Sequence, residues 1–296
     1  MAKKLIHDLI NAGVHFGHAA SRWNPKMSPF VFTKRGETHI IDVKKTLAGM
    51  LIAKKLLAET VSGGKDVVFV GTKRQAQKAV ERVAQKCGMH YVSTRWLGGT
   101  LTNFRTIRSR LQRLQQLEAM EQSGTLESES KKQASRLKRE MRKIRANLDG
   151  IRNMSRLPGV VVVVDTKKEY LALHEARKLG IATIGLIDTD SDPDKVDVAI
   201  PANDDSIRAI ELILGELADA VAIGKTMVSA QAETRQKPKR IRSRRPVLAR
   251  ADGGAETESE HREPVAGPRP EQQVEPEQAA PGLPKAGTQQ PDSTQQ

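Results

Sequence analysis

Two histidines and several aspartates have the residue types and spacing of a metal site. Asp188 follows an apolar run at 183–187, and Asp204 follows another at 198–200. If these runs are neighbouring parallel strands, both acidic turns lie at the carboxyl edge of one sheet, where α/β folds place ligands. The candidate ligands are His15, His18, Asp188, Asp204 and Asp205. Such a set suits zinc or magnesium. The alternative is that the aspartates are turn and helix-cap residues and the histidines bond to backbone.

A second candidate site lies in the sequence DVVFVGTKRQAQKAV at 66–80. We expect residues 67–70 to form a buried strand and Thr72 to be the N-cap of the helix that follows. Lys73 and Arg74 then lie beside free backbone N–H groups, which suits an anion. The glycines of phosphate-binding and dinucleotide-binding loops are absent. An RNA phosphate therefore fits this turn better than a cofactor phosphate, and a glycine that simply ends a strand is the alternative.

Two other loops place a tryptophan next to an arginine. The segment 14–29 is interrupted by glycine and proline and is expected to be an ordered, functional loop, and the segment 93–104 contains two consecutive glycines. Tryptophan and arginine planes stack on bases in RNA sites, although a lone loop tryptophan is more often a packing anchor. The candidate RNA-binding residues are Arg22, Trp23, Lys26, Lys73, Arg74, Arg95, Trp96, Asn103, Arg105 and Arg108.

Strands and helices that alternate along the chain must position these loops, and this alternation predicts a parallel sheet. The clearest buried strand is the run of five valines at 160–164. Two short apolar runs near the N-terminus, at 30–32 and 39–41, predict a hairpin. Other strands are expected at 67–70, 89–92, 183–187 and 198–200.

A basic helical hairpin interrupts the α/β pattern. Apolar residues recur at heptad spacing in two stretches, from Phe104 to Leu117 and from Ala134 to Ile151, which predicts an antiparallel coiled-coil arm. Lysine and arginine greatly outnumber acidic residues on its outer faces. We therefore divide the chain into an α/β RNA-binding domain at 1–102 and 157–228, the coiled-coil hairpin at 103–156, a basic arm at 229–246 and a disordered, acidic, proline-rich tail at 247–296.

The composition favours a polyanionic partner. The formal charge is +14 and the sequence pI is about 9.9, which points to nucleic acid or an acidic membrane surface. Cys87 is the only cysteine, so an internal disulfide framework and a multi-cysteine zinc site are excluded. No apolar run reaches the roughly 18 residues of a membrane span, so we expect a soluble, cytoplasmic protein. We expect no membrane partner, and a membrane surface stays open only as a competing class. Aromatic residues make up 3% of the chain, so RNA recognition would depend mainly on phosphates and shape.

Five segments together resemble the bacterial ribosomal small-subunit protein two family. They are AGVHFGH (12–18), RWNPKM (22–27), FVGTKR (69–74), RWLGGTLTN (95–103) and the pair DTDSDP and IPANDD (188–205). The resemblance covers about 5–226, and the segment AAS at 19–21 departs from its more polar pattern. It implies an α/β/α sandwich with a protruding coiled-coil hairpin, bound to small-subunit ribosomal RNA. It also implies neighbouring small-subunit proteins and a docking surface for ribosomal protein one.

The resulting hypothesis is a structural, ribosome-bound protein that is not an enzyme, is not a homo-oligomer and requires no cofactor. No nucleophile, base and acid set is present, and neither G-x-S-x-G nor H-E-x-x-H occurs. Two competing classes stay open. One is a sugar-phosphate or nucleotide-binding α/β enzyme that uses the carboxyl edge of the sheet, and the other is a basic protein of membrane surfaces or the nucleoid.

Overall fold

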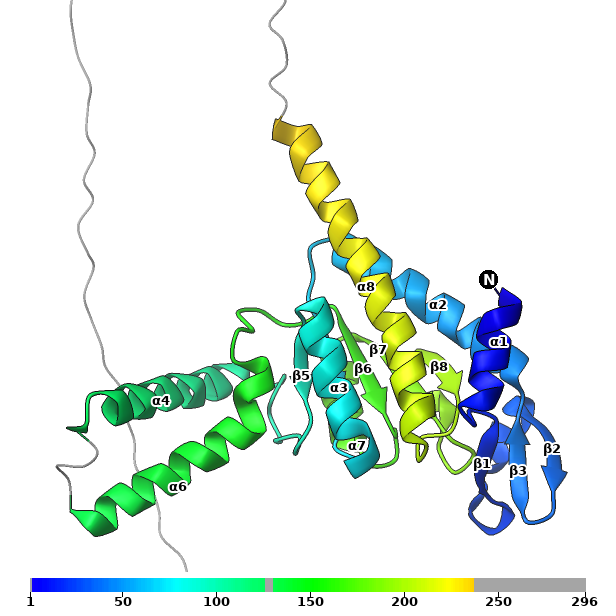
Figure 1. The fold of residues 1–296 in the computed structure, drawn as a ribbon, viewed down its shortest axis with the longest axis horizontal. Helices are drawn as coiled ribbons and strands as arrows, with labels where there is room; N and C mark the ends of the chain where they lie inside the picture. The colour runs from blue at the N-terminus through cyan, green and yellow to red at the C-terminus, as the bar shows by residue number, and fades with distance from the viewer. Residues whose placement is uncertain (1, 126–129, 237–296) are drawn as a thin grey trace, which may run out of the picture. The chain divides into compact units, whose positions relative to one another are not determined.

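The computed structural model describes residues 2–125 and 130–236 (Figure 1). The predicted acidic tail and most of the predicted basic arm lie outside the described residues. Within the described ranges, no helix is long and apolar enough to cross a membrane.

Five parallel strands form the central sheet, in the order β5-β4-β6-β7-β8. Their bounds are β4 Val67–Val70, β5 His90–Val92, β6 Val160–Val164, β7 Ala182–Ile187 and β8 Val198–Pro201. Every residue of β4 and β6 is buried, as expected for β-branched side chains in strands covered on both faces. In the middle of the sheet, Val162 is in register with Phe69 on one side and Ile184 on the other. The predicted parallel sheet is confirmed.

Helices cover both faces of this sheet (Figure 1). Val67, Phe69 and alternate valines of β6 pack with α2 (Val43–Ser62), α3 (Arg74–Cys87) and α8 (Ile207–Gln236). Val68, Val70 and the other valines of β6 pack with α7 (Tyr170–Lys178) and with the loop that contains Trp96. The fold is therefore an α/β fold with helices flanking a parallel sheet.

A small antiparallel sheet precedes the central one. It has the order β1-β3-β2, with β1 Phe16–Ala19, β2 Val31–Arg35 and β3 Thr38–Ile41, and it follows helix α1 (Ala2–Asn11). The predicted hairpin is confirmed. The expectation that 14–29 is all loop was wrong, because 16–19 pairs with β3 as a third strand and short 3-10 helices, η1 (Ala20–Arg22) and η2 (Pro25–Phe30), follow.

Two basic helices leave the sheet together (Figure 1). They are α4 (Phe104–Gln122) and α6 (Lys131–Leu148), and η3 (Asp149–Ile151) follows α6. Leu114, Leu117 and Met141 are buried between the two helices. Glu118, in the last turns of α4, accepts hydrogen bonds from Arg145, at 2.7 Å, near the end of α6, and from Arg152 after η3. These apolar and ionic contacts pack the two helices against each other.

Two predicted helix caps were wrong for one physical reason. The N-cap of α3 is Lys73, and Thr72 donates its hydroxyl to Glu169 instead. Helix α8 begins at Ile207, after a turn in which Asn203 accepts backbone N–H groups, so Asp204 is not its cap. In both cases a polar side chain that fits a local cap is used in a contact between distant segments. Helix α8 also continues to Gln236, into the segment predicted to be a basic arm.

Candidate functional site

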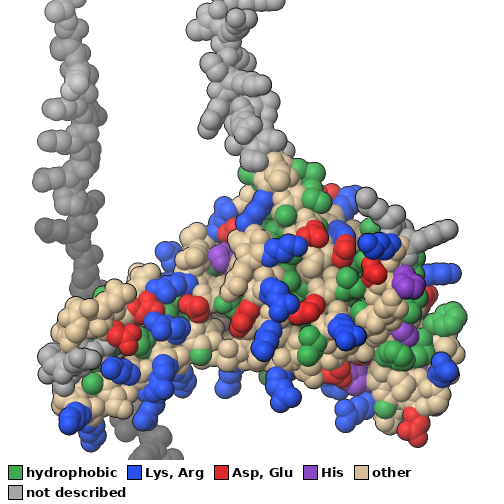
Figure 2. Space-filling view, in the orientation of Figure 1, with side chains coloured by type: hydrophobic (Ala, Val, Ile, Leu, Met, Phe, Trp, Pro, Cys, Tyr) green, Lys and Arg blue, Asp and Glu red, His purple; other side chains and the backbone are tan. Residues whose placement is uncertain are grey.

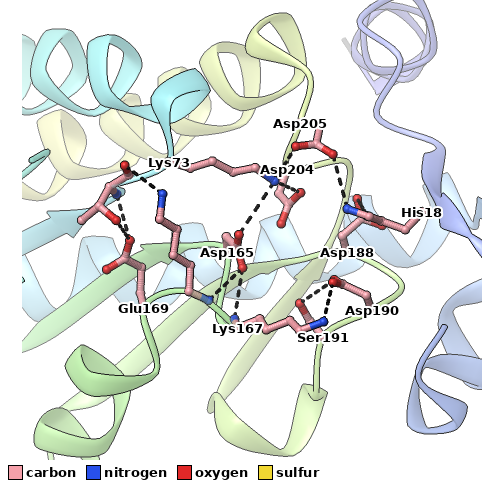
Figure 3. A network of polar contacts seen from close by, with 12 residues as sticks. His18, Lys73, Asp165, Lys167, Glu169, Asp188, Asp190, Ser191, Asp204 and Asp205 are labelled. Carbon is pink, nitrogen blue, oxygen red and sulfur yellow. Dashed lines mark hydrogen bonds and ion pairs between the residues drawn. The ribbon is translucent and has the colours of Figure 1, made fainter. Parts of the chain in front are cut away.

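The loops at the carboxyl ends of the strands converge at one edge of the sheet (Figure 3). The strand order reverses between β4 and β6, and ligands of open α/β sheets bind at such a point. Strand β4 leads into Lys73 and β6 into Asp165, while β7 and β8 lead into Asp188 and Asp204. Because β7 and β8 are neighbours, the prediction that the two acidic turns share an edge is confirmed.

The Lys73 ammonium lies among three carboxylates. Its Nζ is 2.7 Å from Asp204, 2.5 Å from Asp205 and 3.8 Å from Asp165, and the side chain is 16% exposed (Figure 3). Burial acts to lower the pKa of Lys73, but the hydrogen bonds to Asp204 and Asp205 outweigh it and raise the pKa. This lysine is therefore charged and already paired.

Asp204 experiences the opposite balance. It is 1% exposed, and burial, together with the nearby charges of Asp188 and Asp165, raises its pKa to about 7, although the hydrogen bond from Lys73 acts to lower it. The surroundings thus favour the charged form of Lys73 but disfavour the charged form of Asp204. The two pKa values are both raised because Asp204 is buried and several carboxylates surround the single Lys73 ammonium.

His18 is the second cation of the cluster. Its Nδ1 lies 2.9 Å from Asp188 and its Nε2 lies 3.3 Å from Asp205 (Figure 3). The hydrogen bond to Asp188 outweighs burial and raises the pKa of His18 to about 9, so the ring is protonated at neutral pH. Strand β1 places the ring there, and the backbone N–H of His18 donates to Thr189 on the loop after β7, at 2.9 Å.

Three of the five predicted metal ligands come together. Ligand atoms of His18, Asp188 and Asp204 all lie within 4.8 Å of one another. Asp205 bridges the His18 ring and the Lys73 ammonium. His15 is not in that group, and its ring packs on Phe16 with centroids 4.2 Å apart. Imidazole and carboxylate donors fit a divalent cation, although a metal would require the His18 ring to lose its proton.

The turn predicted to receive an anion is bound to a carboxylate of the chain itself. Thr72 donates its backbone N–H, at 2.9 Å, and its hydroxyl to the same oxygen of Glu169. Lys168 donates to the Thr72 carbonyl at 3.2 Å. Asp165 has φ of +68°, and its carboxylate accepts the N–H groups of Lys167 and Lys168. Among the residues proposed for this turn, Arg74 is exposed and has no ion pair with a described carboxylate.

The first tryptophan loop is held against the turn after β7. Lys26 lies 3.2 Å from Asp192 and 2.7 Å from Asp194, and the Trp23 ring lies 5.1 Å from the His39 ring. Arg22 follows β1 in the sequence and directly precedes Trp23. It is exposed and makes no ion pair with a described acidic residue. RNA contact by Lys26 stays a prediction, but a phosphate would compete there with two carboxylates.

The second tryptophan loop is bound to a buried carboxylate of the protein. Trp96 is 6% exposed, and its indole N–H donates to Glu175 at 3.1 Å, so stacking on a base would require the loop to open. Asn103 is the N-cap of α4 and accepts the hydroxyl of Thr106 at 2.8 Å. Arg95 precedes the buried tryptophan and is exposed, and Arg105 and Arg108 are exposed in the first turns of α4.

Sequence reasoning missed two buried glutamates, Glu169 and Glu175. Glu169 lies just before α7, and Glu175 lies in α7 beside the buried Leu173 and Ala176. A signal was present, because glutamate on an apolar helix face is rarely buried without partners. The missing information was the identity of those partners, which are 73 to 97 residues away in the chain.

Cations gather over the helix pair. In Figure 2 lysine and arginine side chains line the part of the surface formed by α4 and α6, with few acidic side chains beside them. Except for Arg113, Arg145, Arg152 and Arg156, the described lysines and arginines from 105 to 156 make no ion pair with a described acidic residue. The helix pair therefore carries many exposed cations without an ion pair, and other such cations lie elsewhere on the described residues, as at Lys34, Lys44 and Lys78.

Comparisons with known proteins agree with one another. A family model described as Ribosomal protein S2 matches residues 9–224. The small ribosomal subunit protein uS2 of Rhodopirellula baltica is 54% identical over 232 residues, which cover 78% of this chain and 89% of that protein. The uS2 proteins of a Synechocystis strain and of Crocosphaera subtropica are 51% and 52% identical, over 74% and 76% of this chain and 82% and 84% of theirs.

Proposed function

Because this chain belongs to the ribosomal protein S2 family, we propose that its exposed arginines bind phosphates of small-subunit ribosomal RNA. The protein is a structural component of the small ribosomal subunit and not an enzyme. The competing hypothesis of a nucleotide enzyme is therefore set aside. We also propose that the protein is ribosome-bound in the cytoplasm and that it does not form a homo-oligomer.

One observation carries the RNA proposal, namely the separation of paired from unpaired cations. Arg22, Arg74 and Arg95 are exposed on loops and make no ion pair with a described carboxylate, and the same holds for Arg105 and Arg108 on α4. A phosphate can bind such an arginine without displacing an internal partner, and Arg presents a planar fork that matches phosphate. Lys26 and Lys73 are already paired, so we give them a smaller share of the binding.

The helix pair forms the extended part of this surface. We propose that residues 103–156 act as an antiparallel coiled-coil arm along the RNA. The buried Leu114, Leu117 and Met141 support this interpretation, and the outer faces supply the cations. Contacts of this kind fix position on the RNA without reading base identity.

A divalent cation at the carboxyl edge is a separate part of the proposal. His18, Asp188 and Asp204 would hold it, with Asp205 adjacent. Such an ion would supply positive charge where Lys73 is now the main counter-charge, and would thereby fasten β1 to the sheet. Metal analysis of the purified protein, compared with a His18→Ala variant, tests this, and equal zinc and magnesium content in the two proteins would count against it.

Docking of small-subunit ribosomal protein one is proposed from the family resemblance alone. A binding titration between the two purified proteins tests it. An absence of binding between the two purified proteins would remove this part of the proposal without affecting the RNA contacts.

The main experiment measures RNA affinity of the full chain as a function of salt. Each phosphate contact contributes about 0.7, for a single strand, to 0.9, for a duplex, to the slope of log K against log salt. We expect the double variant Arg105→Ala, Arg108→Ala to weaken binding to small-subunit ribosomal RNA and to lower that slope by nearly two contacts. Neither arginine has a described ion-pair partner, so the fold should be unaffected.

The matched control changes two cations that are also exposed but are paired. Arg82 and Lys86 on α3 bind Glu211 and Asp219 on α8, each at 2.8 Å. We expect Arg82→Ala, Lys86→Ala to retain the wild-type slope. Equal losses in the two double variants would show that binding follows total charge, and the proposed surface would be wrong.

A further inference from the structure

A buried carboxylate in α7 gathers the donors of a distant loop. Glu175 is 4% exposed. One of its oxygens accepts the Trp96 indole N–H at 3.1 Å and the Gly99 N–H at 2.8 Å. The other accepts the Leu101 N–H at 2.9 Å and the N–H and hydroxyl of Thr102 at 3.1 and 3.2 Å. All five donors belong to the RWLGGTLTN segment, and no described lysine or arginine forms an ion pair with this carboxylate.

The charge of Glu175 is therefore neutralised by amide groups. Burial alone would raise the pKa of Glu175, but the hydrogen bonds from Leu101, Thr102, Trp96 and Gly99 outweigh it and lower the pKa. A carboxylate that accepts several N–H bonds is favoured in its ionised form. At neutral pH the loop thus encloses a negative charge.

The hydrogen bonds to Glu175 fix the positions of the two ends of the loop. The loop contains a left-handed residue, Gly99, with φ of +88°, and its N–H groups would lack partners without the carboxylate. Arg95 stands just before the first anchored residue, Trp96, and Arg105 stands three residues after the last, Thr102. Both arginines are exposed, so the segment is fixed inside while its two ends present cations outside.

We propose that Glu175 is a positioning residue for RNA binding, which holds Arg95 and Arg105 in one fixed relation by anchoring the loop between them. This inference rests on the proposed RNA-binding function, and it assigns a role to a residue that touches no RNA. Charged hydrogen bonds of this kind confer geometric precision, because one carboxylate fixes several donors at once.

Glu169 provides a matched control. It is 3% exposed, lies six residues earlier, and also binds a loop, the turn at Thr72. Both Thr72 donors use the same oxygen of Glu169, and burial raises the pKa of Glu169. A glutamine at 169 therefore keeps its acceptor. A glutamine at 175 instead places an NH₂ group against N–H donors, which breaks the bonds on one side of the carboxyl group.

The test compares wild type, E175Q and E169Q in the full chain, with small-subunit ribosomal RNA transcribed in vitro and titrated at several salt concentrations. At 0.1 M salt each lost phosphate contact weakens binding by roughly tenfold. We expect E175Q to bind about ten- to a hundredfold more weakly with a lower salt slope, and E169Q to bind like wild type. Hydrogen exchange of the amides at 99–102 should be faster in E175Q only.

A double-mutant cycle separates positioning from general destabilisation. In an Arg95→Ala, Arg105→Ala background, E175Q should weaken binding little further, because the groups through which it acts are absent. If E175Q weakens binding equally in both backgrounds, the positioning role is wrong.

A milder variant covers the case in which E175Q does not fold. Trp96→Phe removes one donor and keeps the buried ring, and we expect a few-fold loss of RNA affinity that disappears in the double-arginine background. Wild-type affinity in E175Q, or in Trp96→Phe where E175Q does not fold, would overturn the inference. Failure of the wild type to bind ribosomal RNA would instead refute the proposed function, and the inference with it.

Discussion

Replacing Lys73 by methionine removes the ammonium from the carboxylate cluster while keeping most of the side-chain volume. Asp204, which is 1% exposed, then retains a charge without its nearest counter-charge. Removing one partner from a buried ion pair typically costs about 3 to 5 kcal/mol, because the remaining charge stays desolvated. Lys73 itself is 16% exposed, so we expect a loss of about 3 kcal/mol in the free energy of unfolding at pH 8, at the lower end of that range.

The cost should depend on pH in a defined direction. The pKa of Asp204 is raised from 3.8 to about 7. A carboxyl whose pKa is raised by folding stabilises the protein when protonated, and that stability is lost as the pH rises through about 7. Without Lys73 the pKa of Asp204 should rise further. The destabilisation in Lys73→Met should therefore be at least about 1 kcal/mol smaller at pH 6 than at pH 8, since one pKa unit is worth about 1.4 kcal/mol.

Urea unfolding of the full chain at pH 6 and pH 8, followed by circular dichroism, measures both quantities. The control is Lys86→Met, which removes an ammonium 2.8 Å from Asp219 in an exposed pair. Exposed ion pairs contribute little, so that variant should unfold like wild type at both pH values. If Lys73→Met is no less stable than Lys86→Met, or if its loss does not grow with pH, the cluster does not depend on this ammonium.

Three other changes test separate parts of the structure. Arg74→Ala should leave urea unfolding unchanged and lower the salt slope of RNA binding by about one contact, because Arg74 is exposed and unpaired among the described residues. Gly150→Ala should lower the free energy of unfolding by about 2 kcal/mol or more, since its Cβ would lie 2.2 Å from the Tyr91 carbonyl oxygen. Glu118→Gln should cost about 1 kcal/mol at pH 7. Hydrogen bonds from two arginines lower the pKa of Glu118. That contribution should therefore be lost as the pH falls from the ordinary glutamate pKa through the lowered pKa of the folded protein, which urea unfolding at acidic pH would show.

The sheet was predictable because local residue type and burial agree in its strands. Five consecutive valines at 160–164 admit few other structures, and the residues after them turn back toward the sheet as the α/β alternation requires. The meeting of Asp188 with Asp204 was also predictable, since it follows from two neighbouring parallel strands. Topology alone thus located the carboxylate cluster.

The side-chain contacts within and beside that cluster were not predictable from the local sequence pattern. Thr72 and Asp204 have the residue types of helix caps, and a sequence window offers no sign that Glu169 and Lys73 are within reach. The same limit applies to Trp96, whose buried indole depends on Glu175 in a helix 79 residues away. Such choices are decided by long-range packing, which local propensity does not contain.

The formal charge of +14 is thus a poor guide to where RNA would bind, because it sums cations of two kinds. Lys73 is paired with buried Asp204 at the carboxyl edge, where it offsets the charge of the cluster. Unpaired arginines such as Arg95 and Arg105 lie at the ends of a loop that is anchored by a carboxylate within the protein. If the paired cations stabilise the fold and the unpaired arginines bind the RNA, added salt should release the RNA while the buried ion pairs stay intact. The reason is that salt screens exposed charges far more than buried ones.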